Sequence, residues 1–223
     1  MMRLQGAEII AAGNTRDVYR HPDDPALLIK VVRPSAIKKR YGSGAPWYKF
    51  KRRRYGHLIA VLREVREQLA VRVSGGTHPR FLQKIVGFVE TDLGMGLVVE
   101  AVRSRDGGFA PTVATLASKG LMDAAKMKAL DDFLDEVIAS PAIVADLNPF
   151  NVVYGDASPG APHFVLIDGI GHKNVIPLER MSAAINRWSK ARKVARFRAM
   201  LAERMASPGN PQDAIQGGGQ RPG

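Results

Sequence analysis

Three polar residues in the second half of the chain have side chains that are suited to metal-assisted chemistry: Asp146, Asn151 and Asp168. Asp146 and Asn151 are five positions apart, and Asp168 ends the next apolar run. A carboxylate beside a hydroxyl group can accept its proton. An amide oxygen and a second carboxylate can hold Mg²⁺ against phosphate oxygens, because this cation prefers hard oxygen ligands. The alternative is a hairpin with turn-favouring polar residues. The elements that would position these side chains have to be identified before the two interpretations can be distinguished.

A lysine interrupts the apolar run Leu27–Val32, which otherwise predicts a buried strand. Burying an ammonium group is unfavourable unless an anion pairs with it. Lys30 therefore indicates an anionic partner such as the phosphates of a nucleotide. The alternative is an edge strand whose lysine side chain reaches water.

A helix with two acidic residues is expected soon after this strand. Residues 34–46 predict a loop, and residues 47–73 predict a helix with an apolar stripe of about 3.6-residue period. The stripe consists of Phe50, Leu58, Val61, Leu62, Val65 and Leu69. Glu64 is the better candidate to pair with Lys30 because it comes first, and Glu67 is the second. Either glutamate could instead make i,i+4 pairs on an exposed face.

Four more short runs predict strands, which gives a five-stranded antiparallel sheet with one helix inserted after the third strand. These runs are residues 8–12, 17–20, 84–90 and 96–102. The turn 13–16 contains Gly13, whose small size would let the backbone approach phosphates, or which simply closes a hairpin. Residues 21–25 predict a tight turn in which aspartate side chains bond the backbone.

The second half of the chain is mainly helical. Residues 112–119 and 123–140 predict two helices, and Asp123 suits the positive N-terminal end of the second. Residues 178–205 predict one or two basic helices, with Trp188, Val194, Phe197 and Leu201 on the apolar side. Residues 206–223, rich in Gly, Pro and Gln, predict a disordered tail.

The composition is that of a globular protein. The 223 residues are 45% hydrophobic and 24% charged, and they include no cysteine. Disulfides and thiolate metal sites are therefore excluded. We find no run of the roughly 18–20 apolar residues that spans a bilayer and no signal-peptide pattern at the N-terminus. These features predict a cytoplasmic protein.

The positive charge is concentrated in one stretch of the sequence. The formal net charge is +12, and residues 25–63 contain eleven Lys or Arg and no acid. The densest part, residues 38–54, would suit an anionic partner such as nucleic acid, an acidic membrane surface or a phosphorylated substrate. The alternative is a solvated basic helix face.

Seven short motifs, distributed along the chain, can be compared with those of known families. They are 13–25 (GNTRDVYRHPDDP), 28–32 (LIKVV), 87–96 (GFVETDLGMG), 147–151 (LNPFN), 168–171 (DGIG), 175–178 (VIPL) and 188–192 (WSKAR). By these motifs, over roughly residues 3–205, the chain resembles the bacterial YrbL family, described as PhoP regulatory network proteins. In the order of its elements it resembles the protein-kinase-like fold, which has the same D-x-x-x-x-N and D-x-G spacing.

The resemblance implies an α+β, two-lobed kinase-like fold. The N-lobe would comprise residues 1–103, a reduced helical C-lobe residues 104–205, and the tail the rest. ATP and Mg²⁺ are the implied ligands. Lys30 would hold the α- and β-phosphates, Asp146 would be the base, and Asn151 and Asp168 would bind the metal. The nucleotide site would further include Gly13, Glu64, Glu100 and Val102.

The sequence departs from that of active protein kinases at several positions. Val144 and Ala145 occupy the His and Arg positions before the catalytic aspartate, and Ile170 replaces the Phe of D-F-G. No A-P-E motif follows, and the C-lobe is short. We therefore expect a phosphotransferase whose acceptor is a small molecule or a lipid-linked sugar rather than a protein. The alternatives are a nucleotide-binding pseudokinase with a regulatory role and a basic module that binds an anionic partner on a kinase scaffold.

Overall fold

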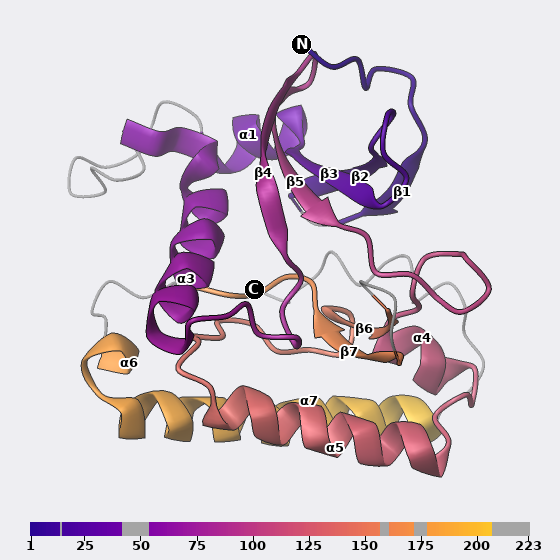
Figure 1. The fold of residues 1–223 in the computed structure, drawn as a ribbon, viewed down its shortest axis with the longest axis vertical. Helices are drawn as coiled ribbons and strands as arrows, with labels where there is room; N and C mark the ends of the chain where they lie inside the picture. Colours follow the sequence, from indigo (N-terminus) through magenta and orange to yellow (C-terminus); the bar gives the residue numbers. More distant parts are fainter. Residues whose placement is uncertain (14, 42–53, 157–160, 172–177, 207–223) are drawn as a thin grey trace. The chain divides into compact units, whose positions relative to one another are not determined.

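The computed structural model describes residues 1–13, 15–41, 54–156, 161–171 and 178–206 (Figure 1). These residues group into two compact units. The first consists of Met1–Val65 and Lys84–Ala101, and the second of Arg66–Gln83 together with the described residues from Val102 onward. Among the described helices, none combines the length and the apolar character needed to cross a bilayer.

The first unit contains a five-stranded antiparallel sheet, as predicted. Its strands are β1 (Ile9–Ala12), β2 (Arg16–Arg20), β3 (Leu27–Val32), β4 (Ile85–Thr91) and β5 (Gly94–Glu100). They are hydrogen-bonded in the order β1-β2-β3-β5-β4 (Figure 1). The central strand β3 is buried along almost its whole length, because it has neighbours on both sides and apolar side chains on both faces.

One face of this sheet packs on a small apolar core. The buried side chains are Leu4, Tyr19, Ile29 and Val31, with Met2, Val89 and Leu93 packed against them. Gly96 of β5 fits tightly there, because a Cβ at this position would lie 2.5 Å from Ile29 Cγ2. A larger residue would force the Ile29 side chain or the neighbouring backbone to shift.

Two turns of the first unit are held by polar side chains. Asp92 Oδ1 accepts from Leu4 N at 2.7 Å, and this bond lowers the pKa of Asp92 below its ordinary value. In the turn after β2, His21 Nδ1 accepts from Asp24 N at 3.1 Å, and Asp24 Oδ1 accepts from Ala26 N at 2.8 Å. The predicted tight turn at residues 21–25, with aspartate bonding to the backbone, is confirmed.

Two helix boundaries differ from the prediction. The predicted loop 34–46 is wrong at its start, where Pro34–Tyr41 forms α1; proline is well suited to a first helical turn because it has no N–H to leave unbonded. The predicted helix 47–73 begins outside the described residues, which exclude 42–53. A 3₁₀ turn, η2 (Gly56–Leu58), comes before α3 (Ile59–Gly75). Gly56 has a φ of +51°, which interrupts a regular α-helix here.

The predicted apolar stripe holds in part, and the buried face of α3 also carries polar side chains. Val61 is buried, Leu58, Leu62 and Val65 are half-buried, Phe50 lies outside the described residues, and the assignment of Leu69 is wrong. Leu69 is 54% exposed, whereas Glu64, Glu67 and Gln68 are almost completely buried. Buried polar side chains need bonded partners. Gln68 Nε2, for example, donates to Gln83 O at 2.6 Å. The predicted alternative of solvent-exposed i,i+4 pairs for the two glutamates is therefore wrong as well.

The second unit is mainly helical and contains one short hairpin. Its elements are α4 (Val113–Ser118), α5 (Ala124–Ala139), β6 (Val152–Gly155), β7 (His163–Leu166), α6 (Leu178–Met181) and α7 (Ala183–Ala206). The helices α5 and α7 lie side by side (Figure 1). Thr112 and Asp123 cap α4 and α5, because each side chain accepts from a backbone N–H of the first turn.

The core of this unit is apolar. Leu130, Phe133, Leu134 and Val137 of α5 pack with Val194, Phe197 and Leu201 of α7 and with the β6–β7 hairpin. Trp188, expected on the same apolar side, is instead 60% exposed, and the Arg192 guanidinium carbon lies 4.8 Å from its ring centroid. The reason is helical phase: the buried residues of α7 recur every three or four positions, and Trp188 falls outside that series.

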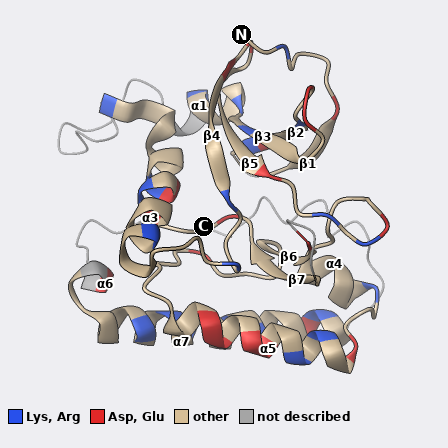
Figure 2. Ribbon diagram, in the orientation of Figure 1, with Lys and Arg blue, Asp and Glu red and all other residues tan. Residues whose placement is uncertain are grey.

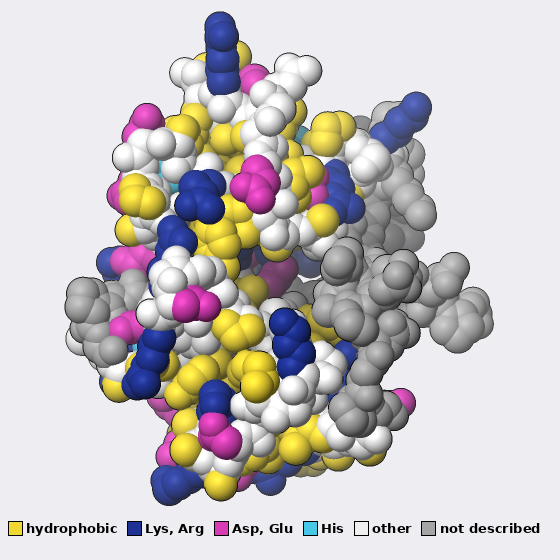
Figure 3. Space-filling view, turned by 90° about the vertical axis from the view of Figure 1, so that its right-hand side faces the viewer, with side chains coloured by type: hydrophobic (Ala, Val, Ile, Leu, Met, Phe, Trp, Pro, Cys, Tyr) yellow, Lys and Arg dark blue, Asp and Glu magenta, His cyan; other side chains and the backbone are white. Residues whose placement is uncertain are grey.

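The described basic residues are distributed unevenly among the helices. Figure 2 shows mostly Lys and Arg along α7, and both charge types along α5. On the face drawn in Figure 3, basic, acidic and apolar side chains are interspersed. Most of the basic stretch 38–54 lies outside the described residues, as does the predicted tail 206–223 apart from Ala206, which ends α7. An anionic partner for that stretch remains a prediction.

The core assignment can be tested by a pair of leucine substitutions. Leu134→Ala removes a fully buried side chain of α5 and should lower the free energy of unfolding by about 2–5 kcal/mol. Leu121→Ala, at a leucine that is 52% exposed, should change it by about 0.5 kcal/mol or less. Urea unfolding followed by circular dichroism measures both, and equal losses would contradict the core.

Candidate active site

The loop that carries Asp146 is hydrogen-bonded to the segment 168–171. Ala145 N and Asp146 N both donate to Gly169 O, at 2.7 and 3.0 Å, and Gly171 N donates to Ile143 O at 2.8 Å. Val144 and Ile170 form the antiparallel bridge between the two segments. Two of the three predicted site residues, Asp146 and Asp168, are thereby brought to one place in the second unit.

A glycine makes this close approach feasible. Gly169 has a φ of +88°, in the left-handed region that side chains disfavour. A Cβ on Gly169 would also overlap the backbone carbonyl of Asp146. The glycine of D-x-G is therefore required here both by its backbone conformation and by its contact with the backbone of the Asp146 loop.

Asn151 is tied to the same loop. Its side-chain Nδ2 donates to Asp146 O at 3.3 Å, and its backbone O accepts from Ile167 N at 2.8 Å. These bonds hold Asn151 between the loop and the end of β7. Because a backbone carbonyl can only accept, the amide nitrogen must face Asp146 and Oδ1 must face elsewhere.

Asn148 is a site residue that the sequence analysis did not identify. Its Nδ2 donates to Asp146 Oδ1 at 3.1 Å, and its Oδ1 accepts from Phe150 N at 2.9 Å and Asn151 N at 3.2 Å. The side chain therefore closes the turn and orients the Asp146 carboxylate. The Asn-Pro pair was the available signal, because asparagine before proline is typical of such a side-chain-bonded turn.

The donor set suits a hard cation. Asp168 is exposed and contributes a carboxylate, and Asn151 Oδ1 accepts no hydrogen bond from any described residue. Across the described residues, no group of three or more His, Cys, Asp or Glu side chains is arranged to hold a metal. A cation here would thus rely on one amide oxygen, one carboxylate and further oxygen ligands such as water or phosphate, which fits Mg²⁺.

A buried charged cluster lies in the first unit. Lys30 and Glu64 are 6% and 4% exposed, and Lys30 Nζ lies 3.9 Å from Glu64 Oε1. Arg16 Nη1 is closer, at 2.7 Å from Glu64 Oε2. The structure thus places Glu64, rather than Glu67, beside Lys30.

Arg16 is expected in the turn after Gly13, but it begins β2. A charged residue in a short strand normally indicates the solvent face, so only the folded structure identifies its buried partner. Its guanidinium group competes with Lys30 for the same carboxylate.

The three other predicted nucleotide-binding residues lie in turns and connections. Gly13 N donates to Arg16 O at 2.9 Å and closes the β1–β2 turn. The Glu100 side chain pairs with Lys84 at 2.6 Å, and Val102 O accepts from Ala110 N at 3.0 Å. Contact of any of these residues with a nucleotide remains a prediction.

Comparison with known proteins identifies relatives along nearly the whole chain. The family model described as PhoP regulatory network protein YrbL matches residues 2–202. The chain is 27% identical over 200 residues to the uncharacterized protein YrbL of Escherichia coli (strain K12), covering 88% of this chain and 84% of that protein. The same values hold for YrbL of Shigella flexneri.

A solved structure supports the fold assignment. A double-mutant form of the Mycobacterium tuberculosis PknI kinase domain superposes with a TM-score of 0.50 and 16% sequence identity, covering 94% of this chain and 80% of that one. At this identity the likeness concerns the fold alone. Together with the five-stranded antiparallel sheet and the helical second unit, it confirms the predicted α+β, protein-kinase-like fold.

Two glycine substitutions test the close contact in the D-x-G segment. Gly169→Ala and Gly107→Ala both place a side chain at positive φ, +88° and +82°, but only Gly169 has the Asp146 backbone against it. Gly107→Ala should lower the free energy of unfolding by about 1–2 kcal/mol. Gly169→Ala should lower it clearly more and speed amide exchange at Asp146, as measured by urea unfolding and hydrogen exchange. Equal effects would show that the contact between Gly169 and the Asp146 backbone does not matter.

Proposed function

The chain belongs to the YrbL family of PhoP regulatory network proteins and has a protein-kinase-like fold, and from these premises we propose that it is an ATP- and Mg²⁺-dependent phosphotransferase. One observation carries the proposal. Backbone and side-chain bonds link the segments that carry Asp146, Asn151 and Asp168, so that these residues could act together as one base and two oxygen ligands.

In this proposal Asp146 acts on the acceptor. Its side chain is exposed, and the bond from Asn148 Nδ2 orients the carboxylate without burying it. The acceptor hydroxyl oxygen attacks the γ-phosphorus, the bond from that phosphorus to the β-phosphate oxygen breaks, and ADP leaves. Asp146 takes the proton that the hydroxyl loses, so charge and atoms balance.

Asn151 and Asp168 hold the cation in the same proposal. Mg²⁺, when bound, would neutralise the phosphate charge that increases during transfer. The β6–β7 register and the Ile167–Asn151 bond fix both ligands relative to Asp146. Lys30, held beside Glu64, would contact the α- and β-phosphates, while Gly13, Glu100 and Val102 would contribute the remaining nucleotide contacts.

The acceptor that we propose is a small molecule or a lipid-linked sugar. Protein kinases position peptide substrates with the segment between D-F-G and A-P-E and with the helices after it. No A-P-E motif occurs in the sequence after Asp168. A compact acceptor that brings one hydroxyl to Asp146 needs no such platform.

A second candidate function is nucleotide binding without turnover. It is favoured by the buried cluster of the first unit, in which Arg16 lies closer to Glu64 than Lys30 does, at 2.7 against 3.9 Å. A carboxylate engaged by Arg16 orients Lys30 less strongly for transfer. The absence of an arginine before Asp146 favours the same alternative.

Binding and turnover can be separated with single substitutions. ATP with Mg²⁺ at 100 times its Kd should raise the free energy of unfolding by about 2.7 kcal/mol, and Lys30→Met and Asp168→Asn should each largely abolish this gain. Asp146→Asn should keep the gain but lower ATP turnover about 100-fold or more. Thermal shift and ADP release measure the two effects.

Asp135→Asn, at an exposed aspartate of α5, is the control and should change neither readout. Absence of any ATP-dependent stabilisation in the unaltered protein would contradict both candidate functions. Stabilisation without ADP release, unchanged by Asp146→Asn, would establish the second candidate instead.

A further inference from the structure

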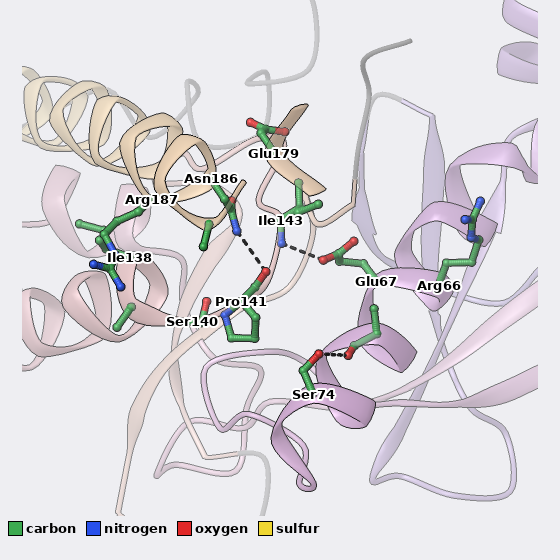
Figure 4. A pocket seen from close by; sticks show the side chains of 13 residues that line it. Arg66, Glu67, Ser74, Ile138, Ser140, Pro141, Ile143, Glu179, Asn186 and Arg187 are labelled. Atoms are coloured by element: carbon green, nitrogen blue, oxygen red, sulfur yellow. Dashed lines mark hydrogen bonds between the residues drawn. The ribbon is translucent and has the colours of Figure 1, made fainter. Parts of the chain in front are cut away.

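The four residues before the Asp146 loop are held through their backbone by three buried side chains. Glu67 of α3 accepts from Ile143 N at 2.8 Å. Asn186 Nδ2 of α7 donates to Pro141 O at 3.1 Å and to Ala142 O at 3.3 Å. Lys190 Nζ, one turn further along α7, donates to Ser140 O. Figure 4 shows Glu67 and Asn186 reaching the segment from two different helices.

These three side chains are among the most buried polar groups in the described part of the chain. Glu67 is 3% exposed, Asn186 6% and Lys190 1%. Burying a carboxylate, an amide and an ammonium group is unfavourable unless their bonds repay it. All three direct a bond to the same four-residue segment.

Apolar packing does not hold this segment on every side. A cavity of about 580 Å³ in the second unit borders Ser140, Pro141 and Ile143, and Glu67 and Asn186 also line it (Figure 4). Ser140 is the C-cap of α5 and has left the helix, with ψ at 156°. Because the cavity leaves one side of the segment without packing contacts, hydrogen bonds are needed to hold the segment in a single conformation.

We propose that Glu67, Asn186 and Lys190 are positioning residues: by clamping residues 140–143 they fix the place of Asp146 for phosphoryl transfer. Ile143 is three residues from Asp146, and Gly171 N binds its carbonyl. The clamp therefore holds one end of the loop, and Gly169 holds the other. This inference rests on the proposed function, and it adds residues that touch neither acceptor nor nucleotide.

The charges around Lys190 show that its ammonium group is buried at a cost. Burial, followed by the nearby Arg187 and Lys193, lowers the pKa of Lys190 from its ordinary 10.5 to about 8, whereas Glu67 and Glu179 act in the opposite direction. Glu179 is itself paired with Lys193 at 3.0 Å. The hydrogen bond to Ser140 O offsets part of the unfavourable desolvation of this ammonium group.

Substitutions at two adjacent buried positions of α3 test the clamp. Glu67→Leu removes the acceptor for Ile143 N, whereas Glu67→Gln keeps an oxygen there. Gln68→Leu is the matched control, because Gln68 is also buried but bonds to Gln83 O, away from the segment. We expect Glu67→Leu to lower kcat about 10- to 100-fold with the KM for ATP changed less than about twofold. Glu67→Gln should restore most of kcat.

Hydrogen exchange provides a readout that needs no activity. Glu67→Leu should speed amide exchange at residues 143–146 at least tenfold. Gln68→Leu should leave the exchange of these amides unchanged, when the two variants are compared at the same loss of thermal stability. Unchanged exchange in Glu67→Leu, or equal exchange and kcat losses in both leucine variants, would overturn the clamp. If the unaltered protein releases no ADP, the proposed function fails, and the exchange result alone decides whether these residues hold the loop.

The low pKa of Lys190 predicts how stability depends on pH. The unfolded chain binds this proton more tightly than the folded protein does, so the contribution of Lys190 to stability rises between about pH 8 and pH 10.5. Lys190→Met should remove that rise, measured as the difference in unfolding free energy between pH 7.5 and pH 10. Lys128→Met, at an exposed lysine of α5, should retain it. Parallel pH profiles for the unaltered protein and Lys190→Met would contradict the lowered pKa.

Discussion

The approach of the Gly169 backbone to the Asp146 loop is the contact on which the candidate site depends. Gly169 O accepts from two consecutive N–H groups, at Ala145 and Asp146, and a side chain at Gly169 would not fit. Asn151 bonds to Asp146 O and to Ile167 N, so that the proposed base and the two proposed oxygen ligands are linked through one hydrogen-bonded frame. The proposed phosphoryl transfer therefore depends on the close packing of the Asp146 loop against residues 168–171.

The helix α3 shows a second constraint, which is that buried polar groups are placed where they bind something. Beside the apolar Val61 and Val71, its inward positions hold Glu64, Glu67 and Gln68, while Leu69 faces solvent. In the first unit Glu64 meets Lys30 and Arg16, and in the second Glu67 meets the backbone before Asp146. An amphipathic helix built only for stability would bury the leucine.

Patterns that depend on local chemistry were predictable from the sequence, and those that depend on partners were not. Apolar runs located the strands, and Asp123 marked the start of α5. Residues 21–25 and 91–94 formed side-chain-bonded turns, which accounts physically for two of the family's motifs. The polar residues on the inward face of α3 were missed because hydrophobic periodicity assumes an apolar interior. The burial of Arg16 was missed because a charged side chain in a strand normally faces water.

A structure determined with Mg²⁺ and a non-hydrolysable ATP analogue tests the central claim most directly. The account predicts a cation about 2.0–2.1 Å from Asn151 Oδ1 and from a carboxylate oxygen of Asp168, bridging phosphate oxygens. It also predicts that the Asp146 carboxylate lies beside the γ-phosphate, where the acceptor hydroxyl would bind. A nucleotide bound with its cation away from Asn151 and Asp168 would contradict the assignment of these residues.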